Sequence, residues 1–469
     1  MKNSIIFIAS ILFSTLFYRQ SIGLNILLFA VITNIVLLVF NPSKYKEKGT
    51  IIKAFIFLFT AFFVFKSPSV LTFFTMLISF VLLVGSVSES KSAIYIQLIN
   101  GMYSSIIASF AHYFDRIQNE IEAVEKQKIN YVFWLKIIGI PILFLSLFIG
   151  LYRNSNPIFN NLIGRVDFSF INIQWLLFTV LGYYLFYNIS NPIKIEPATE
   201  KDLNTVNYLI KEKLKPVTVD KIKNENQLGA ILIILLNILI GILIITDYLY
   251  LNADINVDNA IGFSEKVHQG IYTLIFSIMV AIGLIIYFFR GNLNFYKENK
   301  ILKIATYIWI LLNLILVFTT ALKNQLYVIQ FGYTYKRIGV YVYLILVAIG
   351  LVFTFIKVYR IKNIVFLFRQ NLQVAFIILI LASSINWDVF ITNYNLYEVK
   401  KASIDFNYLL WLNNNAVQLK KYKDDHTNNE SDLINYNRIP KRIENKYNGY
   451  LEDLENNSWQ EKIYANFKM

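Results

Sequence analysis

Five positions in the second half of the chain bring charged or polar side chains to the ends of long apolar segments. The charge pattern described below predicts that these ends lie at one face of a membrane. Ionisable groups near membrane depth are energetically costly, so they tend to pair or to line a cavity. The sequence therefore predicts a polar pocket for a small polar or lipidic ligand, with these residues in its wall: Asp247, His268, Lys323, Arg337, Trp387 and Asp388.

A simpler interpretation of the same residues competes with the pocket. Lys323 and Arg337 could extend into the lipid headgroups while the aspartates only end helices. His268 begins an apolar segment, where a histidine is more often a hydrogen-bonding group than a proton relay. An acid–base enzyme would have only His268 and Asp388 as its pair.

Several kinds of chemistry are excluded by what the sequence lacks. Cysteine is absent, the chain has 3 histidines, and no HExxH pattern occurs, so we expect no metal site. The glycine-rich patterns that bind nucleotide phosphates and the G-x-S-x-G pattern of hydrolases are also absent. We therefore expect no cofactor. A protein that is not an enzyme is favoured, although the sequence leaves enzyme activity open.

The apolar segments that carry the candidate residues are long enough to cross a membrane. Hydrophobic residues make up 56% of the chain and charged residues only 16%, against about 25% in a soluble domain. A membrane-spanning helix needs about 20 mostly apolar residues. The sequence thus predicts an all-α, polytopic integral membrane protein with about 11 or 12 transmembrane helices. The strong segments are 22–40, 68–87, 131–151, 172–190, 228–250, 268–289, 302–322, 338–358 and 364–385, and the weaker ones are 4–18, 51–65 and 93–112.

Lysine and arginine residues predict how these helices are oriented. The chain carries a net charge of +14, and the whole excess lies before residue 398. Short loops that face the cytoplasm collect Lys and Arg, so we expect the 191–227 loop in the cytoplasm and the 398–469 tail outside. A nucleic-acid partner is excluded, because the positive charge is spread between apolar segments and not gathered on one soluble surface.

The N-terminal half fits this orientation only if one weak segment does not cross the membrane. Lys44, Lys46 and Lys48 also favour the cytoplasm, yet five candidate spans separate them from the 191–227 loop. An odd number of crossings would place the two loops on opposite faces. Either the most polar segment, 93–112, does not cross, or the charge rule is broken locally.

The chain divides into four regions by these features. The polar loop contains an amphipathic pattern that predicts a surface helix over 199–215, started by Thr199 and Asp202 and stopped by Pro216. The tail contains a short run with large apolar residues over 405–412 and a helical pattern over 443–454, which predict at most a small polar helical cap. The regions are the N-terminal transmembrane region 1–190, the basic amphipathic cytoplasmic loop 191–227, the C-terminal transmembrane region 228–397 and the polar extracytoplasmic tail 398–469.

Motifs of the C-terminal half resemble a bacterial membrane family catalogued as domain of unknown function 4173. The resemblance covers about residues 225–410, and Tyr333 departs from it, because leucine is usual at that position. It implies a polytopic protein of the bacterial inner membrane, and it supplies no activity, substrate or cofactor. The motifs are Val267 to Gly270, Phe288 to Phe295, Trp309 to Asn313, Gly332 to Gly339, Asn386 to Asp388, and Tyr394 with Asn395.

Three functions are compatible with the sequence. The leading hypothesis is a multi-pass membrane protein, embedded in the lipid bilayer, that binds or transports a small polar or lipidic ligand through the outer-face pocket. The second is a membrane scaffold or sensor that couples to a protein partner through the 191–227 loop or the tail. The third is a membrane enzyme that acts on lipid-linked substrates.

Overall fold

The computed structural model describes residues 2–122, 172–211, 216–252, 276–400, 404–426 and 438–468, with parts of 140–159. Within this part of the chain, 7 helices are long and apolar enough to cross a membrane. Three further apolar helices are shorter: Lys2–Phe17, Leu24–Phe40 and Phe276–Phe288. The prediction of an all-α, polytopic membrane protein is confirmed.

The N-terminal helices form one bundle around a core of phenylalanine rings. Phe29 lies within 6.4 Å, centroid to centroid, of Phe57, Phe80 and Phe186, so four helices meet at one ring cluster. Ser69 caps the fifth α-helix of the chain by accepting a hydrogen bond from the Thr72 backbone N–H, which fixes the tight turn before it. The bundle consists of α1 (Lys2–Phe17), α2 (Leu24–Phe40), the short α3 (Pro42–Tyr45), α4 (Lys48–Lys66), α5 (Val70–Ser88) and α9 (Ile173–Ser190).

The C-terminal helices form a second bundle, which the N-terminal bundle contacts through α15. Asn237 joins two of its helices, because its side-chain N–H donates to the Ala305 carbonyl at 2.9 Å. Amides serve in this way as links between transmembrane helices. The bundle consists of α11 (Pro216–Asn252), the helix Phe276–Phe288, the 3-10 helix η1 (Asn292–Phe295), α13 (Lys300–Phe331), α14 (Tyr335–Tyr359) and α15 (Ile364–Ser383).

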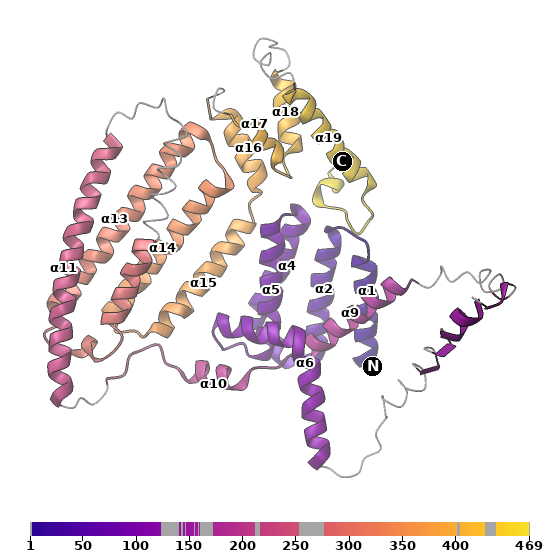
Figure 1. The fold of residues 1–469 in the computed structure, drawn as a ribbon, viewed down its shortest axis with the longest axis horizontal. Helices are drawn as coiled ribbons and strands as arrows, with labels where there is room; N and C mark the ends of the chain where they lie inside the picture. The colour runs from indigo at the N-terminus through magenta and orange to yellow at the C-terminus, as the bar shows by residue number, and fades with distance from the viewer. Residues whose placement is uncertain are drawn as a thin grey trace.

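The lysine-rich connections lie at one end of the molecule, which we call the basic end. Figure 1 shows the N-terminus, α3, α10 (Glu196–Asn204) and the starts of α11 and α15 at this end. Residues 404–426 and 438–468 lie at the opposite end, which we call the tail end. The predicted separation of the basic loops from the tail therefore holds in the fold.

Helix α6 (Ile94–Glu122) starts and remains at the basic end over its first sixteen residues. It lies along the chain segment that leaves α9: Ser109 N–H donates to Asn188, Ser104 Oγ donates to the Ile193 carbonyl, and Asn100 accepts from Ile195 N–H at 3.0 Å. Figure 1 shows this part of α6 crosswise to α4 and α5. Residues Ile94–His112 are nevertheless one of the 7 helices long and apolar enough to cross a membrane, so the prediction that segment 93–112 does not cross stays a prediction.

The helix predicted over 199–215 is wrong beyond residue 204. Helix α10 ends at Asn204, and the chain then runs extended beside the turn that follows α14. Backbone pairing replaces the helix: Leu209 N–H donates to the Ile361 carbonyl at 3.1 Å, and Tyr208 forms a β-bridge with Lys362. Pro216 does not merely stop a helix, because it begins α11. Local periodicity could not reveal this pairing with a distant turn.

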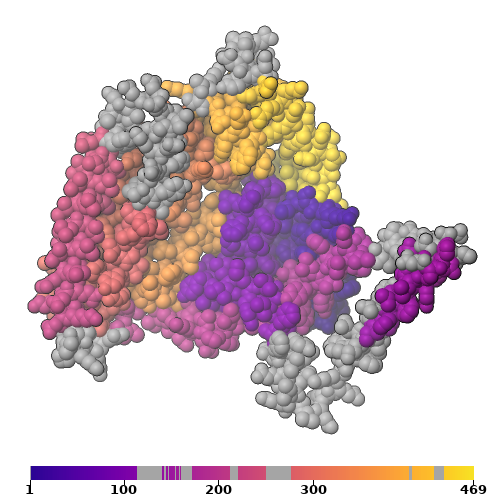
Figure 2. Space-filling view, in the orientation of Figure 1, coloured from indigo at the N-terminus to yellow at the C-terminus, as the bar shows by residue number. Residues whose placement is uncertain are grey.

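The tail forms a helical cap that packs against both bundles, as Figures 1 and 2 show. The helix predicted over 443–454 is confirmed, and it extends over Ile439–Asn456. The apolar side chains of Leu409, Leu419 and Ile443 pack against α14 and α16 in one buried cluster. Toward the N-terminal bundle, Leu24 N–H donates to the Lys462 carbonyl at 2.8 Å. The helices are α16 (Trp387–Tyr397), α17 (Phe406–Trp411), α18 (Ala416–His426), α19 (Ile439–Asn456) and the 3-10 helix η5 (Tyr464–Phe467).

Candidate functional site

The turn between α13 and α14 is built around Arg337. The guanidinium donates to the carbonyls of Phe331, at 2.8 Å, and Gly332, and it lies 4.0 Å from the centre of the Tyr327 ring. Thr334 caps α14 by accepting from the Arg337 backbone N–H at 3.3 Å. Because Arg337 is 9% exposed and its donors face backbone carbonyls, it holds the turn in shape.

Asn395 clamps the same turn from α16. Its side chain accepts from Tyr333 N–H at 2.6 Å and donates to the Tyr333 carbonyl at 2.9 Å. Gly332 has φ +75°, and a Cβ atom there would stand 2.3 Å from the Asn395 side-chain oxygen. Only glycine fits both the backbone conformation and the space. Two of the motifs found in the sequence, Gly332 to Gly339 and Tyr394 with Asn395, thus form one structure.

Asp388 stands in the first turn of α16 and links three parts of the chain. One carboxylate oxygen accepts from the Tyr335 hydroxyl at 2.7 Å, and the other accepts from the Asn414 backbone N–H of the tail at 2.9 Å. Asn386 caps the helix by accepting from Val389 N–H. The carboxylate is 5% exposed and lies at a helix N-terminus, where the helix dipole stabilises negative charge.

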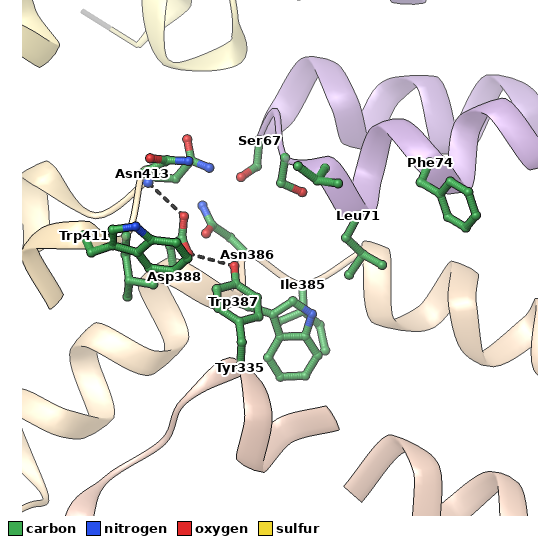
Figure 3. Close-up of a pocket in the computed structure, with 14 residues that line it drawn as sticks. Ser67, Leu71, Phe74, Tyr335, Ile385, Asn386, Trp387, Asp388, Trp411 and Asn413 are labelled. Carbon is green, nitrogen blue, oxygen red and sulfur yellow. Dashed lines mark hydrogen bonds between the residues drawn. The ribbon is translucent and has the colours of Figure 1, made fainter. Parts of the chain in front are cut away.

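A pocket of about 430 Å³ lies beside this carboxylate at the tail end. Figure 3 shows its wall, which comes from the α4–α5 turn, the start of α14, the α15–α16 turn and the loop after α17. The polar part of the wall is made by serine, asparagine, tyrosine and aspartate side chains. The apolar part includes Phe74, Ile385, Trp387 and Trp411, and none of the described residues that line the pocket is Lys or Arg.

The two tryptophans of the pocket differ in how firmly the surrounding residues hold their side chains. Trp387 donates its ring N–H to the Ala382 carbonyl at 2.8 Å and packs edge-on against Phe390, so its position is fixed. Trp411 is 73% exposed and stacks on Tyr408, with ring centres 6.2 Å apart. One aromatic wall is therefore rigid, and the other presents an open face to a ligand.

A lysine of the tail lies behind the pocket wall. Lys446 donates to the carbonyls of Leu410, at 3.0 Å, and Leu412. Burial lowers the pKa of Lys446 to about 8, and the nearby Asp388 charge acts against that decrease. The ammonium therefore compensates part of the Asp388 charge from outside the cavity and leaves the cavity itself without a cation.

The predicted cluster separates into distinct parts. Trp387 and Asp388 line the pocket, whereas Arg337 supports the neighbouring turn and forms no ion pair with Asp388. Asp247 and Lys323 form an ion pair at 2.7 Å that joins α11 to α13 and does not line this pocket. His268 lies outside the described residues. Arg337 does not pair with Asp388, because its Nη1 donates to the Phe331 and Gly332 carbonyls instead.

Most of the pocket wall comes from residues that the sequence did not single out. Ser67, Ser69 and Phe74 come from the α4–α5 turn and α5, more than 300 residues before Asp388. Trp411 and Asn414 come from the tail. The only feature of the sequence that pointed to the residues of the α4–α5 turn was the proline after Lys66 and Ser67. The only feature that pointed to the residues of the tail was the tryptophan in a short apolar run.

A second buried charge lies at the basic end, where Asp202 of α10 meets Arg369 of α15 at 3.0 Å. Asp202 also accepts from the Tyr95 hydroxyl at 2.6 Å and from Ala93 N–H at 2.7 Å. Burial raises the pKa of Asp202, but these hydrogen bonds and the guanidinium outweigh burial and hold the pKa below its usual value. Tyr95 and Ala93 belong to the start of α6, so this ion pair ties the two bundles together.

Comparison with known proteins agrees with the membrane architecture. No curated protein and no solved structure matches the chain. One family matches it over residues 7–419 and is described as a domain of unknown function, DUF4153. This family differs from the one that the C-terminal motifs resemble, and the match extends through the N-terminal bundle, which that resemblance did not include. Because the match covers most of the sequence, the chain belongs to the DUF4153 family.

Proposed function

We propose that this multi-pass membrane protein binds an amphipathic, lipid-like ligand in the pocket at the tail end. The observation that carries the proposal is the position of the buried Asp388 carboxylate beside exposed apolar side chains of membrane-facing helices. Phe74, 54% exposed, lies one turn into α5, and Ile385, 43% exposed, follows the end of α15. A ligand could place its head group at Asp388 and its apolar part along these residues.

The chemistry of the wall selects the head group. A carboxylate offers about four acceptor positions, and the two hydrogen bonds to Asp388 leave capacity for donors of a ligand. The asparagine and serine side chains of the wall add neutral donors and acceptors. Since no cation lines the pocket, we propose a head group rich in hydrogen-bond donors and without negative charge, such as a sugar or an ammonium group.

Three amphiphiles with the same tail test this proposal: octyl glucoside, octyltrimethylammonium and octyl phosphate, added to purified protein in detergent. We expect the first or second to raise the unfolding temperature, since about tenfold excess over Kd stabilises by about 1.4 kcal/mol. Octyl phosphate should give no increase. Asp388→Asn and Trp411→Ala should abolish the increase, whereas Trp459→Ala, which alters a tail tryptophan away from the pocket, should keep it. Equal stabilisation by all three would contradict the proposal.

We propose further that the basic end faces the cytoplasm of a bacterial inner membrane and that the tail lies outside. The loops that carry excess lysine share one end of the fold, as cytoplasmic loops do. The native chain has no cysteine, so single cysteines can be introduced at the exposed Lys211 and Lys421. On intact cells, an impermeant thiol reagent should label Lys421→Cys and spare Lys211→Cys until the cells are opened. The reverse pattern would place the pocket on the cytoplasmic side.

The scaffold and enzyme hypotheses stay predictions. The tail already uses its apolar face within the chain, where Leu409 and Leu419 are fully buried, so a protein partner would have to bind its polar face. The acid–base pair that an enzyme would need includes His268, which lies outside the described residues. Among the residues that line the pocket, Asp388 has no basic partner, which favours binding over acid–base chemistry.

A further inference from the structure

A second cavity, of about 420 Å³, lies between α14, α15 and the helix Phe276–Phe288. Its wall consists almost entirely of aliphatic and aromatic side chains, and it is open on one side. The two polar side chains in the wall form hydrogen bonds within their own helices: Thr354 donates to the Gly350 carbonyl, and Asn371 donates to the Leu367 carbonyl. The groove therefore offers its occupant an apolar surface and few free polar groups.

The length and position of the groove match one leaflet of a bilayer. Along α15 its wall runs from Ile364, at the basic end, to Ala375. At about 1.5 Å per residue this distance is about 16 Å, which is close to half of the hydrocarbon core of about 30 Å. All three helices that form the wall are apolar, and α14 and α15 are long enough to span a membrane. An acyl chain of a lipid fits this place by chemistry and by depth.

The end of the groove carries positive charge. The turn between α14 and α15 contains Arg360 and Lys362 and no acidic residue. Lys362 is 9% exposed, with its ammonium 3.4 Å from the centre of the Tyr208 ring, so it is already engaged. Arg360 is exposed, and it forms no ion pair with any acid in the described part of the chain. A phosphate beside the groove would meet this guanidinium directly.

We propose that the groove holds one acyl chain of an anionic phospholipid whose phosphate binds Arg360. The positive charge of the turn between α14 and α15 favours an anionic lipid over a neutral one. The apolar wall of the groove favours a lipid over a soluble phosphate, because only a lipid has an acyl chain to place there. The site is separate from the pocket at the tail end and does not depend on the ligand proposed there. An anionic lipid bound here would fill the space between α14 and α15 at the basic end and brace the turn that pairs with Tyr208.

The full-length protein, purified in detergent, should retain phosphatidylglycerol over phosphatidylcholine with the same acyl chains, as counted by native mass spectrometry. Arg360→Gln should reduce this preference by about fivefold, the effect of one basic residue near a lipid surface, and Arg360→Lys should keep most of it. Lys46→Gln removes an exposed charge that follows α3 of the N-terminal bundle and does not line the groove, and it should leave the preference unchanged.

Filling the groove tests the acyl-chain part of the proposal. Ala375→Phe should lower retention of both lipids, whereas Leu381→Phe, at a 60% exposed position of α15 outside the groove, should not. Unchanged unfolding temperatures without added lipid would show that both variants fold. The proposal is overturned if the wild-type protein retains both lipids equally, or if Lys46→Gln reduces the lipid preference as much as Arg360→Gln does. It is also overturned if Ala375→Phe retains as much lipid as the wild type, or if inorganic phosphate stabilises the protein as well as phosphatidylglycerol does.

Discussion

Replacing Arg369 by alanine is expected to destabilise the protein by about 3–5 kcal/mol, because the change leaves the carboxylate of Asp202 buried without its cation. The side chain of Asp202 is 3% exposed and that of Arg369 is 17% exposed. The same guanidinium also donates to the Thr205 carbonyl at 3.1 Å and to the Asn207 side chain at 2.7 Å. Thermal or denaturant unfolding of the purified protein in detergent would measure the loss.

A double-mutant cycle separates the ion pair from the other hydrogen bonds of the guanidinium. Asp202→Asn keeps a hydrogen-bonding side chain but removes the charge, so Arg369→Ala should cost less in that background than alone. The matched control is Arg290 with Glu225, an arginine–carboxylate pair at the same distance of 3.0 Å whose arginine is 51% exposed. That pair should contribute about 0–1 kcal/mol. A coupling energy for Asp202 and Arg369 no larger than the control would show that burial adds nothing.

The expected size of this effect follows from where the pair lies. Asp202 receives hydrogen bonds from Ala93 and from Tyr95 of α6, which packs against α5 and α9 of the N-terminal bundle, and Arg369 belongs to α15 of the C-terminal bundle. The tail joins the same two bundles at the opposite end, since Asn414 donates to the Pro68 carbonyl at 2.9 Å and to Asp388. Loss of the Asp202–Arg369 ion pair should therefore let the two bundles move relative to each other. The pocket wall would be affected too, because it contains residues from both bundles.

Features that depend on local sequence could be predicted. Apolar runs of about 20 residues specify transmembrane helices, because the hydrocarbon core satisfies no backbone polar group and a helix satisfies its own. The last α-helix of the tail followed from the helical spacing of residues such as Ile443 and Leu454, both buried in the structure. The common location of the lysine-rich connections followed from their charge alone.

Features that depend on distant partners could not be predicted in the same way. Thr199 and Asp202 look like the start of a helix, yet their side chains are buried against Asn100 and Tyr95 of α6. Arg337 looks like a partner for an acid, but its Nη1 donates to backbone carbonyls of its own turn, and a sequence does not display these acceptors. The pocket wall likewise joins three regions whose proximity only the folded chain creates.

Gly101→Ala is the second substitution with a large expected effect, because it separates two helices that touch through their backbones. A Cβ atom at Gly101 of α6 would stand 1.9 Å from the Val81 carbonyl oxygen of α5, and one at Gly85 of α5 would stand 1.8 Å from the Gln97 carbonyl oxygen of α6. Backbone atoms cannot rotate away, so the helices must move apart. We expect a loss of about 1–3 kcal/mol or more, the usual cost of overpacking, in unfolding experiments in detergent.

The control for this prediction is a helical glycine in open space. Gly339 of α14 has no atom within 4 Å of the place that a Cβ would take, so Gly339→Ala should stabilise the protein by about 0.5–1 kcal/mol through the lower entropy of alanine in the unfolded chain. Gly85→Ala combined with Gly101→Ala should cost less than the sum of the two changes, because one separation of α5 from α6 relieves both clashes. Strict additivity, or a Gly101→Ala protein as stable as Gly339→Ala, would show that the two helices do not cross at these glycines.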